Sequence, residues 1–255
     1  MGRITCYRER MEYCSDRKNS RIILALDPIN CSSLIDYLND KIRLLREEVC
    51  AIKFNFHVIL PLSLQDMLNV NNTVHSCGLQ SIADLKLNDI SSTNQIAINH
   101  LVNMGFDAVI VNPIIGMNEL SKAVGLSHDY NFGVISLVYM SHVGAREGFG
   151  LSVINDIETS SQASPLYMRL LEYSNGCDVD GIIVGGTRID VINSISREKK
   201  SPIYSPGLGL QGGDPNEAAR SGTDYFIVGR SIIQSKDPLK TARLFKEQTN
   251  TIKKG

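Results

Sequence analysis

Short apolar runs rich in β-branched residues recur along the chain, and stretches with helical spacing separate them. After the first run, for example, Leu34, Leu38, Ile42 and Leu45 fall on one face of a helix. Such alternation predicts parallel strands joined by right-handed crossovers. The expected strands are residues 21–27, 50–56, 80–86, 108–112, 132–138, 181–185, 202–206 and 225–229. Eight units close a (β/α)8 TIM barrel; six would leave an open doubly wound sheet, an alternative that stays because the fourth and seventh runs are weak.

The length of the chain, 255 residues, is typical of one such barrel. Its hydrophobic content of 43% and charged content of 21% are ordinary for a globular protein with a full core. We therefore expect one α/β domain over residues 21–255, preceded by an extension at residues 1–20 that is either helical or flexible. Residues 141–161, rich in glycine, serine and charge, predict a functional lid or a disordered loop after the fifth strand.

The charge and cysteine content exclude several classes of partner. The net charge is −1, so no broad basic surface is available for nucleic acid or an anionic membrane. No apolar run approaches the roughly 20 residues that cross a bilayer, and the first 20 residues lack the apolar core of a signal peptide. The six cysteines show no metal-binding spacing. These features predict a cytoplasmic protein with free thiols and no bound metal.

Charged residues gather at the ends of the first three predicted strands. Asp84 and Lys86 share one face of the third strand, and Lys53 lies on the corresponding face of the second. Asp27 ends the first strand, and Asp89 follows the third. For any one of these residues, a structural ion-pair network at the barrel rim is as good an explanation as a catalytic role. Their convergence where barrels keep their active sites favours catalysis, because charges inside a barrel are costly unless they are paired.

A second group of residues follows the seventh and eighth predicted strands. Residues 205–215 read SPGLGLQGGDP, and the eighth strand ends in Gly229-Arg230. Glycines let backbone amides approach an anion, and an arginine can bind a phosphate through two hydrogen bonds. Because these two loops form the usual phosphate site of the fold, the sequence predicts a phosphorylated small molecule as ligand.

Together these motifs resemble those of the orotidine 5′-monophosphate decarboxylases, and the bacterial and archaeal branch in particular. The resemblance covers roughly residues 21–248 and departs at Ser91-Ser92, where Pro-Glu is common, and at Val143, where proline is usual. The matching motifs are Ala25-Leu26-Asp27, Lys53, Asp84-x-Lys86-x-x-Asp89-Ile90 with Thr93-Asn94, Met140-Ser141-His142, Pro206-Gly207-x-Gly209-x-Gln211-Gly212-Gly213-Asp214 and Gly229-Arg230.

The resemblance implies decarboxylation of orotidine 5′-monophosphate to uridine 5′-monophosphate (UMP), the final step of de novo UMP synthesis, without metal or organic cofactor. Lys86 would protonate C6 of the pyrimidine, Asp84 would face the departing carboxylate, and Lys53 and Asp89 would complete the charge array. Asp89 and Thr93 would reach into the site of a second subunit and contact the ribose there, so the enzyme would be a homodimer. The other implied substrate contacts are Asp27 for the ribose, Ser141 for the pyrimidine edge, Gln211, Gly229 and Arg230 for the 5′-phosphate, and Pro206, Gly207, Gly209 and Gly212 in the same loop.

Two other functions remain possible from the sequence. One is a Mg²⁺-dependent decarboxylase or aldolase for sugar phosphates on the same barrel, but such enzymes tend to carry an acidic group where this chain has Lys53. The other is a non-catalytic barrel that binds nucleotide phosphates, which would have no reason to keep the charged array. His142 lies beside Ser141, yet no acid is placed to complete a hydrolase triad.

Overall fold

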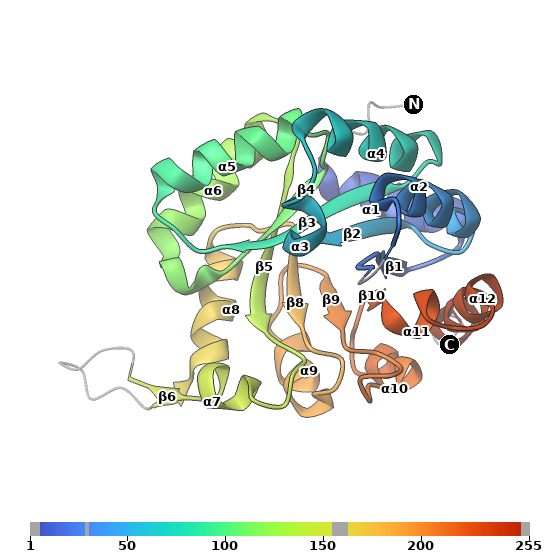
Figure 1. The fold of residues 1–255 in the computed structure, drawn as a ribbon. Coiled ribbons are helices and arrows are strands. Elements are labelled where there is room, and N and C mark those ends of the chain that lie inside the picture. Colours follow the sequence, from blue (N-terminus) through green and yellow to red (C-terminus); the bar gives the residue numbers. More distant parts are fainter. Residues whose placement is uncertain (1–5, 29–30, 155–162, 251–255) are drawn as a thin grey trace.

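A computed structural model describes residues 6–28, 31–154 and 163–250 (Figure 1). Eight parallel strands form a closed barrel in the order β1-β10-β9-β8-β5-β4-β3-β2. The predicted (β/α)8 architecture is therefore confirmed, and the open sheet is excluded. The strands are β1 (Ile22–Ala25), β2 (Ala51–Asn55), β3 (Gln80–Leu87), β4 (Ala108–Val111), β5 (Gly133–Tyr139), β8 (Gly181–Val184), β9 (Ile203–Pro206) and β10 (Tyr225–Val228).

Helices follow the strands and form the outer layer of the barrel. The longer ones are α2 (Leu34–Leu45), α4 (Leu64–Ser76), α5 (Ser91–Asn103), α6 (Met117–Asp129), α8 (Leu166–Gly176), α9 (Ile189–Ser196), α10 (Pro215–Arg220) and α12 (Pro238–Asn250). Short helices α3 (Phe56–Ile59), η1 (Pro113–Ile115) and α11 (Arg230–Ile233) begin directly at the ends of strands. Local sequence determines where helix α4 begins, because Ser63 and Asp66 form a reciprocal capping box at its first turn.

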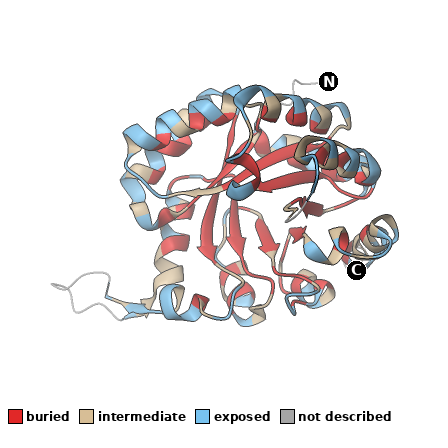
Figure 2. Cartoon of the chain, in the orientation of Figure 1, coloured by how far each residue is buried: buried red, intermediate tan, exposed pale blue. Residues whose placement is uncertain are grey.

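Alternation along the strands divides the core into two layers. Ile22 and Leu24 of β1 face outward and pack with the helices, whereas Ile23 and Ala25 face the barrel interior. Figure 2 shows the resulting pattern, with buried strands at the centre and helices that are exposed on their outer faces. The barrel interior is therefore filled with side chains, and a ligand can enter only at one of its ends.

Helix α1 (Tyr7–Lys18), which lies within the expected N-terminal extension, closes the end of the barrel where the strands begin. Tyr7, Met11 and Cys14 are buried in the interior cluster. A Cβ atom at Gly133, the first residue of β5, would lie only 2.4 Å from the ring of Tyr7, so this contact requires glycine. The opposite end, where the strands finish, remains available for a site.

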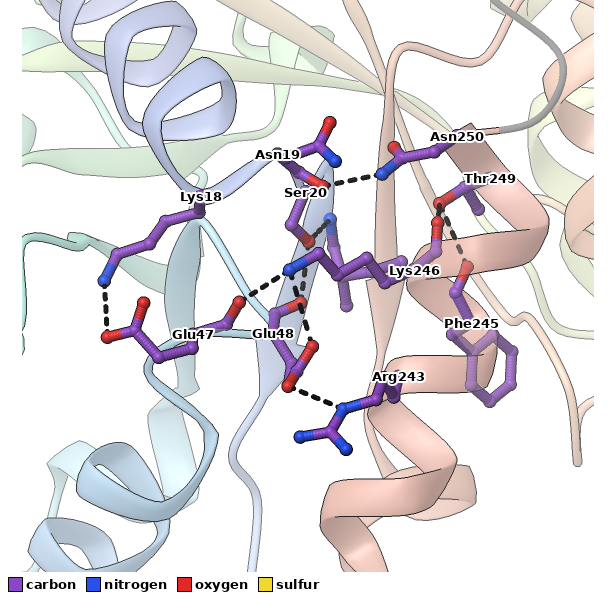
Figure 3. Close-up of polar contacts among 11 residues, drawn as sticks. Lys18, Asn19, Ser20, Glu47, Glu48, Arg243, Phe245, Lys246, Thr249 and Asn250 are labelled. Carbon is purple, nitrogen blue, oxygen red and sulfur yellow. Dashed lines mark hydrogen bonds and ion pairs between the residues drawn. The ribbon is translucent and has the colours of Figure 1, made fainter.

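Helix α12 is fastened to the same end as α1 by polar contacts (Figure 3). Arg243 Nε lies 3.0 Å and Lys246 Nζ lies 3.4 Å from the carboxylate oxygens of Glu48, whose side chain is only 7% exposed. Asn250 Nδ2 donates to the backbone oxygen of Asn19 at 2.6 Å. These contacts join the first and last helices beside the β1–β10 pair that closes the barrel.

The long connection after β5 contains more regular structure than the sequence predicted. Helix α7 (Ala145–Phe149) and an antiparallel ribbon of β6 (Ser152–Val153) and β7 (Ser164–Pro165) occupy it, whereas residues 155–161 of the expected lid lie outside the described residues. Aromatic packing accounts for the order of this region, because the ring of Tyr139 lies 5.6 Å from those of Phe149 and Tyr167. No helix within the described ranges has the length and apolar character needed to cross a membrane.

Candidate active site

A pocket of about 290 Å³ opens at the end of the barrel where the strands finish. Its walls come from all eight strands of the barrel and from several of the loops after them. Ten residues predicted from the sequence line it: Asp27, Lys53, Asp84, Lys86, Ser141, Pro206, Gly207, Gln211, Gly229 and Arg230. The structure therefore brings the charged array and the glycine-rich phosphate motif to the same cavity.

Four charged side chains form a chain of alternating sign across the pocket floor. Lys53 Nζ lies 2.7 Å from Asp84 Oδ2 and 3.7 Å from Asp27 Oδ2. Lys86 Nζ lies 2.5 Å from the other oxygen of Asp84. The side chains of Lys53 and Asp84 are 5% and 8% exposed, whereas that of Lys86 is 30% exposed. Asp84 thus holds two ammonium groups, one buried and one that reaches the open cavity.

The pKa values of the buried pair record how strongly these charges interact. Burial alone would lower the pKa of Lys53, but the carboxylates of Asp84 and Asp27 outweigh it and raise that pKa above its ordinary value. Burial alone would raise the pKa of Asp84, but Lys53 and Lys86 outweigh it and lower that pKa. Lys53 and Asp84 are therefore both charged at neutral pH.

Lys86 occupies an unusual position in the backbone. Its φ angle is +48°, in the left-handed region that costs a residue with a side chain about 1 kcal/mol or more. The pairing of β3 with β4 shifts register between Ala83 and Leu87, as in a β-bulge. Regular alternation predicted that Lys86 would lie beside Asp84. Both residues line the pocket, although the pairing of the strand is irregular here.

The loop between β9 and α10 is shaped by three glycines with positive φ. Gly207, Gly209 and Gly212 have φ angles of +90°, +75° and +97°, which only glycine adopts readily. A Cβ atom at Gly207 would come within 2.6 Å of Ser141 Cβ, so the loop also lies close to the end of β5. Gly209 and Gly212 do not line the pocket and instead allow the loop to turn.

The same loop is tied to the end of β10, where Arg230 begins α11. The backbone nitrogen of Leu210 donates to Ser231 Oγ at 2.9 Å, and Ser141 Oγ donates to Gln211 Oε1 at 3.4 Å. The side chain of Arg230 is exposed and makes no ion pair within the part of the chain that the structure describes. Gly207, Gly229 and the guanidinium of Arg230 therefore lie together at the pocket, an arrangement suited to a phosphate.

Two predicted residues, Asp89 and Thr93, lie outside the pocket of their own chain. Both are exposed, and Asp89 Oδ1 accepts a hydrogen bond from the backbone nitrogen of Ile90 at 2.7 Å. The resemblance assigned them to the site of a second subunit, and their exposure leaves them free for such a contact. Within a single chain they contribute nothing to the cavity.

Sequence reasoning gave several pocket residues no role, although three of them, Ala25, Met140 and His142, lie within the motifs that carried the resemblance. Asn55 had a readable signal, because it lies two residues after Lys53 on the same face of β2. His142 lines the pocket although no acid accompanies it. The others are Ala25, Ile110, Leu137, Met140, Ile183, Leu208, Leu210, Ile227 and Ser231. Most of these are apolar, and an apolar strand residue at the end of the barrel interior cannot be told from an ordinary core residue by sequence alone.

Comparison with known proteins identifies the family of this chain. A family model described as "Orotidine 5'-phosphate decarboxylase / HUMPS family" matches residues 20–245. Orotidine 5'-phosphate decarboxylase of Pyrococcus abyssi is 33% identical over 224 residues, which cover 87% of this chain and 95% of that protein.

Solved structures show the same fold. Orotidine 5'-monophosphate decarboxylase from Methanocaldococcus jannaschii, complexed with the inhibitor BMP, superposes with a TM-score of 0.77 at 26% identity and covers 91% of this chain and 99% of its own. A putative orotidine-monophosphate-decarboxylase from Toxoplasma gondii gives a TM-score of 0.84 at 21% identity, with 99% of this chain and 97% of that chain covered. The resemblance inferred from the motifs is confirmed, and the chain belongs to the orotidine 5'-phosphate decarboxylase / HUMPS family.

Proposed function

We propose that this protein is an orotidine 5′-monophosphate decarboxylase that forms UMP in the last step of de novo pyrimidine nucleotide synthesis. Its membership of the family supports this function. The observation that carries it is the position of Asp84, which holds the ammonium groups of both Lys53 and Lys86 at the floor of a cavity with a phosphate-binding side. The free thiols, two of them exposed, fit a reducing cytoplasm as the place where it acts.

Lys86 is the proton donor in this proposal. When the bond between C6 and the carboxylate breaks, carbon dioxide leaves and the electron pair stays on C6, in an orbital that cannot delocalise into the ring. A fixed ammonium beside C6 stabilises this carbanion and then transfers its proton to it. Lys86 suits this role better than Lys53, because its side chain reaches the open cavity whereas Lys53 is buried.

The carboxylate of Asp84 holds and orients Lys86, whose Nζ lies 2.5 Å from it. Asp84 would also lie against the departing carboxylate of the substrate. Lys53 is a positioning residue, since it holds Asp84 from the buried side and contacts Asp27. Asp27 would hold the hydroxyls of the ribose.

The opposite side of the pocket would bind the 5′-phosphate. Arg230 and the amides around Gly229 and Gly207 supply the donors, and the Gln211 side chain, near Ser141, would join the phosphate to the pyrimidine edge. Pro206, Gly209 and Gly212 give the loop its shape. Binding energy from the phosphate, remote from C6, can then be used to order the site around the reacting bond.

We further propose that the enzyme is a homodimer in which Asp89 and Thr93 enter the partner's site. Large apolar side chains are exposed just after β2 and β3, at the same end of the barrel as the pocket: Phe56 is 52%, Leu60 74% and Ile90 64% exposed. Exposed apolar groups beside a half-open site are typical of a surface that a second copy covers.

Mixing two inactive variants tests the shared site. In a heterodimer of Lys86→Ala and Asp89→Ala chains, one site carries both changes and the other carries neither. Random exchange of subunits should therefore restore about a quarter of the wild-type activity. If the mixture stays inactive after exchange has been verified, the two subunits do not share residues in this way.

The proposed reaction is tested by following orotidine 5′-monophosphate by ultraviolet absorbance with the purified protein, with and without a chelator. We expect turnover that the chelator does not change. Loss of activity with the chelator would favour the Mg²⁺-dependent alternative, against which the ammonium of Lys53, 2.7 Å from Asp84, now argues. Binding of UMP without turnover would favour the non-catalytic barrel.

A further inference from the structure

Helix α5 begins two residues after Asp89 without a capping side chain of its own. Its N-cap residue is Ile90, whose side chain cannot accept a hydrogen bond, and its first turn contains no acidic residue. Helices α2, α4 and α10 are instead capped by their own side chains, which are Ser33, Ser63 and Asp214. The free N–H groups at the start of α5 therefore need an acceptor from elsewhere.

A carboxylate of the neighbouring helix α6 supplies this acceptor (Figure 1). Glu119 belongs to the first turn of α6, and its Oε2 atom accepts a hydrogen bond from the backbone nitrogen of Ser91, the first residue of α5, at 2.5 Å. Its other oxygen lies 2.7 Å from Lys122 Nζ. Hydrogen bonds from Lys122 and from Ser91 hold the pKa of Glu119 below its ordinary value, so the group is charged at neutral pH. A negative charge at the N-terminus of α5 also interacts favourably with the helix dipole.

A second contact holds the backbone just before the helix. Asn94 is buried, and its Nδ2 atom donates to the backbone oxygen of Asp89 at 2.6 Å. The segment is therefore held from two sides, by Asn94 within α5 and by Glu119 of α6. The side chains of Asp89, Ile90 and Thr93 stay exposed. Contacts that fix a backbone and leave its side chains free suit a segment that presents those side chains to another molecule.

We propose that Glu119 is a positioning residue for the active site of the partner subunit. By fixing the backbone of Ser91, its carboxylate sets the direction in which Asp89 and Thr93 leave their own chain and enter the neighbouring cavity. This inference rests on the proposed function and its shared site. Glu119 does not line the pocket of its own chain, so it acts only through the segment that it holds.

Proline at position 91 would remove the need for Glu119. A proline suits the first position of a helix, because it has no N–H to satisfy and its φ angle is already helical. Ile90 has φ −65° and ψ 160°, the extended conformation that a residue before proline favours. Ser91 also lies where the chain departs from the Pro-Glu that is common in the family it resembles. The hydrogen bond from Glu119 therefore satisfies a donor that proline would not have.

The substitutions Glu119→Ala and Ser91→Pro, alone and together, test the proposal through kcat/KM for orotidine 5′-monophosphate. Glu119→Ala should lower this value about tenfold, because loss of a charge-assisted hydrogen bond lets the segment leave its position. Ser91→Pro should stay close to the wild type, and in that background Glu119→Ala should have no effect. Glu172→Ala is the matched control, since it removes a carboxylate that pairs with Arg169 on α8, and it should leave kcat/KM unchanged. Equal losses from Glu119→Ala in both backgrounds, or no loss in either, overturn the proposal.

Subunit mixing shows in which site Glu119 acts. Glu119→Ala chains are exchanged with an excess of Lys86→Ala chains, and wild-type chains are exchanged with the same excess in parallel. In each heterodimer, the site with an intact lysine receives Asp89 and Thr93 from the Lys86→Ala chain. Because that chain carries an intact Glu119, the difference between Glu119→Ala and wild type should disappear. A difference that persists means that Glu119 acts on its own site or on the stability of its own chain, and overturns the proposal.

The mixture of Lys86→Ala and Asp89→Ala chains separates failure of this inference from failure of the proposed function. If that mixture regains activity while Glu119→Ala keeps the kcat/KM of the wild type, the shared site stands and only the role of Glu119 is wrong. If the mixture stays inactive after verified exchange, the shared site is wrong and the role of Glu119 falls with it.

Discussion

The two ends of the barrel use the same kinds of residue in opposite ways. Where the strands begin, α1 fills the opening with Tyr7 and Met11, and charged groups meet partners that satisfy them, as Glu48 does with two cations of α12. Where the strands finish, the pocket holds a lysine with left-handed backbone, an arginine without an ion pair in the described structure, and an unsatisfied asparagine. Ion pairs are present at both ends, so an ion pair alone does not mark a functional site.

A recurring arrangement at the closed end makes the structural role of its ion pairs clear. Three aspartates, each just before a strand, accept a hydrogen bond from a backbone nitrogen at the start of a neighbouring strand and also contact a cationic or histidine side chain. They are Asp107 with Ser81 and His75, Asp180 with Val134 and His128, and Asp224 with Ile203 and Lys199. Each of these carboxylates accepts a hydrogen bond from the backbone, whereas among the described residues the carboxylate of Asp84 accepts from the two lysines alone.

The largest effect is expected from Lys86→Ala. Loss of the proton donor and of the charge beside C6 should lower turnover by at least about five orders of magnitude, about 7 kcal/mol of transition-state stabilisation. Turnover is followed by ultraviolet absorbance, and binding of UMP by calorimetry should persist. Lys199→Ala is the matched control, because it removes a lysine paired with an aspartate at the closed end and should reduce stability without reducing turnover. Near-normal turnover in Lys86→Ala would mean that the lysine at the open end is no more catalytic than Lys199 at the closed end.

Tyr7→Ala should have the converse effect. Tyr7 is 1% exposed and packs on Gly133 inside the closed end, so its removal leaves a cavity and should lower the free energy of unfolding by about 3–5 kcal/mol. Chemical denaturation measures the loss, and turnover at a temperature where the variant is folded should stay close to that of the wild type. Tyr13→Ala, on the same helix but 50% exposed, is the control. Equal stability of the two variants would mean that α1 does not contribute to the core.

Arg230→Ala should affect binding at the open end and little else. Loss of the charged donors to the 5′-phosphate should raise KM for orotidine 5′-monophosphate about 100-fold, which corresponds to about 2.7 kcal/mol. Arg220→Ala removes another exposed arginine, at the end of α10, and should leave KM unchanged. Unchanged KM in Arg230→Ala would show that the phosphate lies elsewhere.

The sequence predicted the barrel well, because a buried parallel strand is a continuous apolar run. Even the weak fourth run proved to be a strand, β4. The sequence did not predict that α1 would close one end of the barrel, although Tyr7, Met11 and Cys14 are spaced as one face of a helix. Helix α1 is so rich in charge that its pattern predicts a helix but not the surface on which it packs.

The site was predicted less completely than the fold, for reasons that differ between residues. Ionic residues such as Lys53 and Asp84 are recognisable because burying a charge inside a barrel is costly and needs a cause. Asn55 is not recognisable, because asparagine at the end of a strand is usually a helix cap. Only the structure shows that Asn55 lines the pocket and that its Oδ1 has no hydrogen-bond partner among the described residues. The assignment of Asp89 and Thr93 to a partner's site depends on a second chain and stays a prediction.

The smallest expected effect concerns pH at the closed end. The hydrogen bond to Asp107, at 2.9 Å, raises the pKa of His75 above its ordinary value, although burial and Arg10 oppose this. Because the folded-state pKa is the higher one, protonated His75 contributes stability that is fully present below the unfolded-state pKa of about 6.5 and is lost as the pH rises through the folded-state value. The side chain is 40% exposed, so this contribution should not exceed about 1 kcal/mol.

Chemical denaturation of wild type and His75→Gln at several pH values measures this contribution. Glutamine keeps a hydrogen-bond donor near Asp107 but carries no charge, so the stability difference should be largest near pH 5.5, where histidine is protonated, and should shrink by pH 8.5. In an Asp107→Asn background the same substitution should show no such trend, because the carboxylate that favours the charged ring is gone. A difference that stays constant with pH in both backgrounds would mean that the His75–Asp107 contact acts only as a neutral hydrogen bond. Turnover should remain unaffected throughout, since this pair lies at the end of the barrel opposite Lys86.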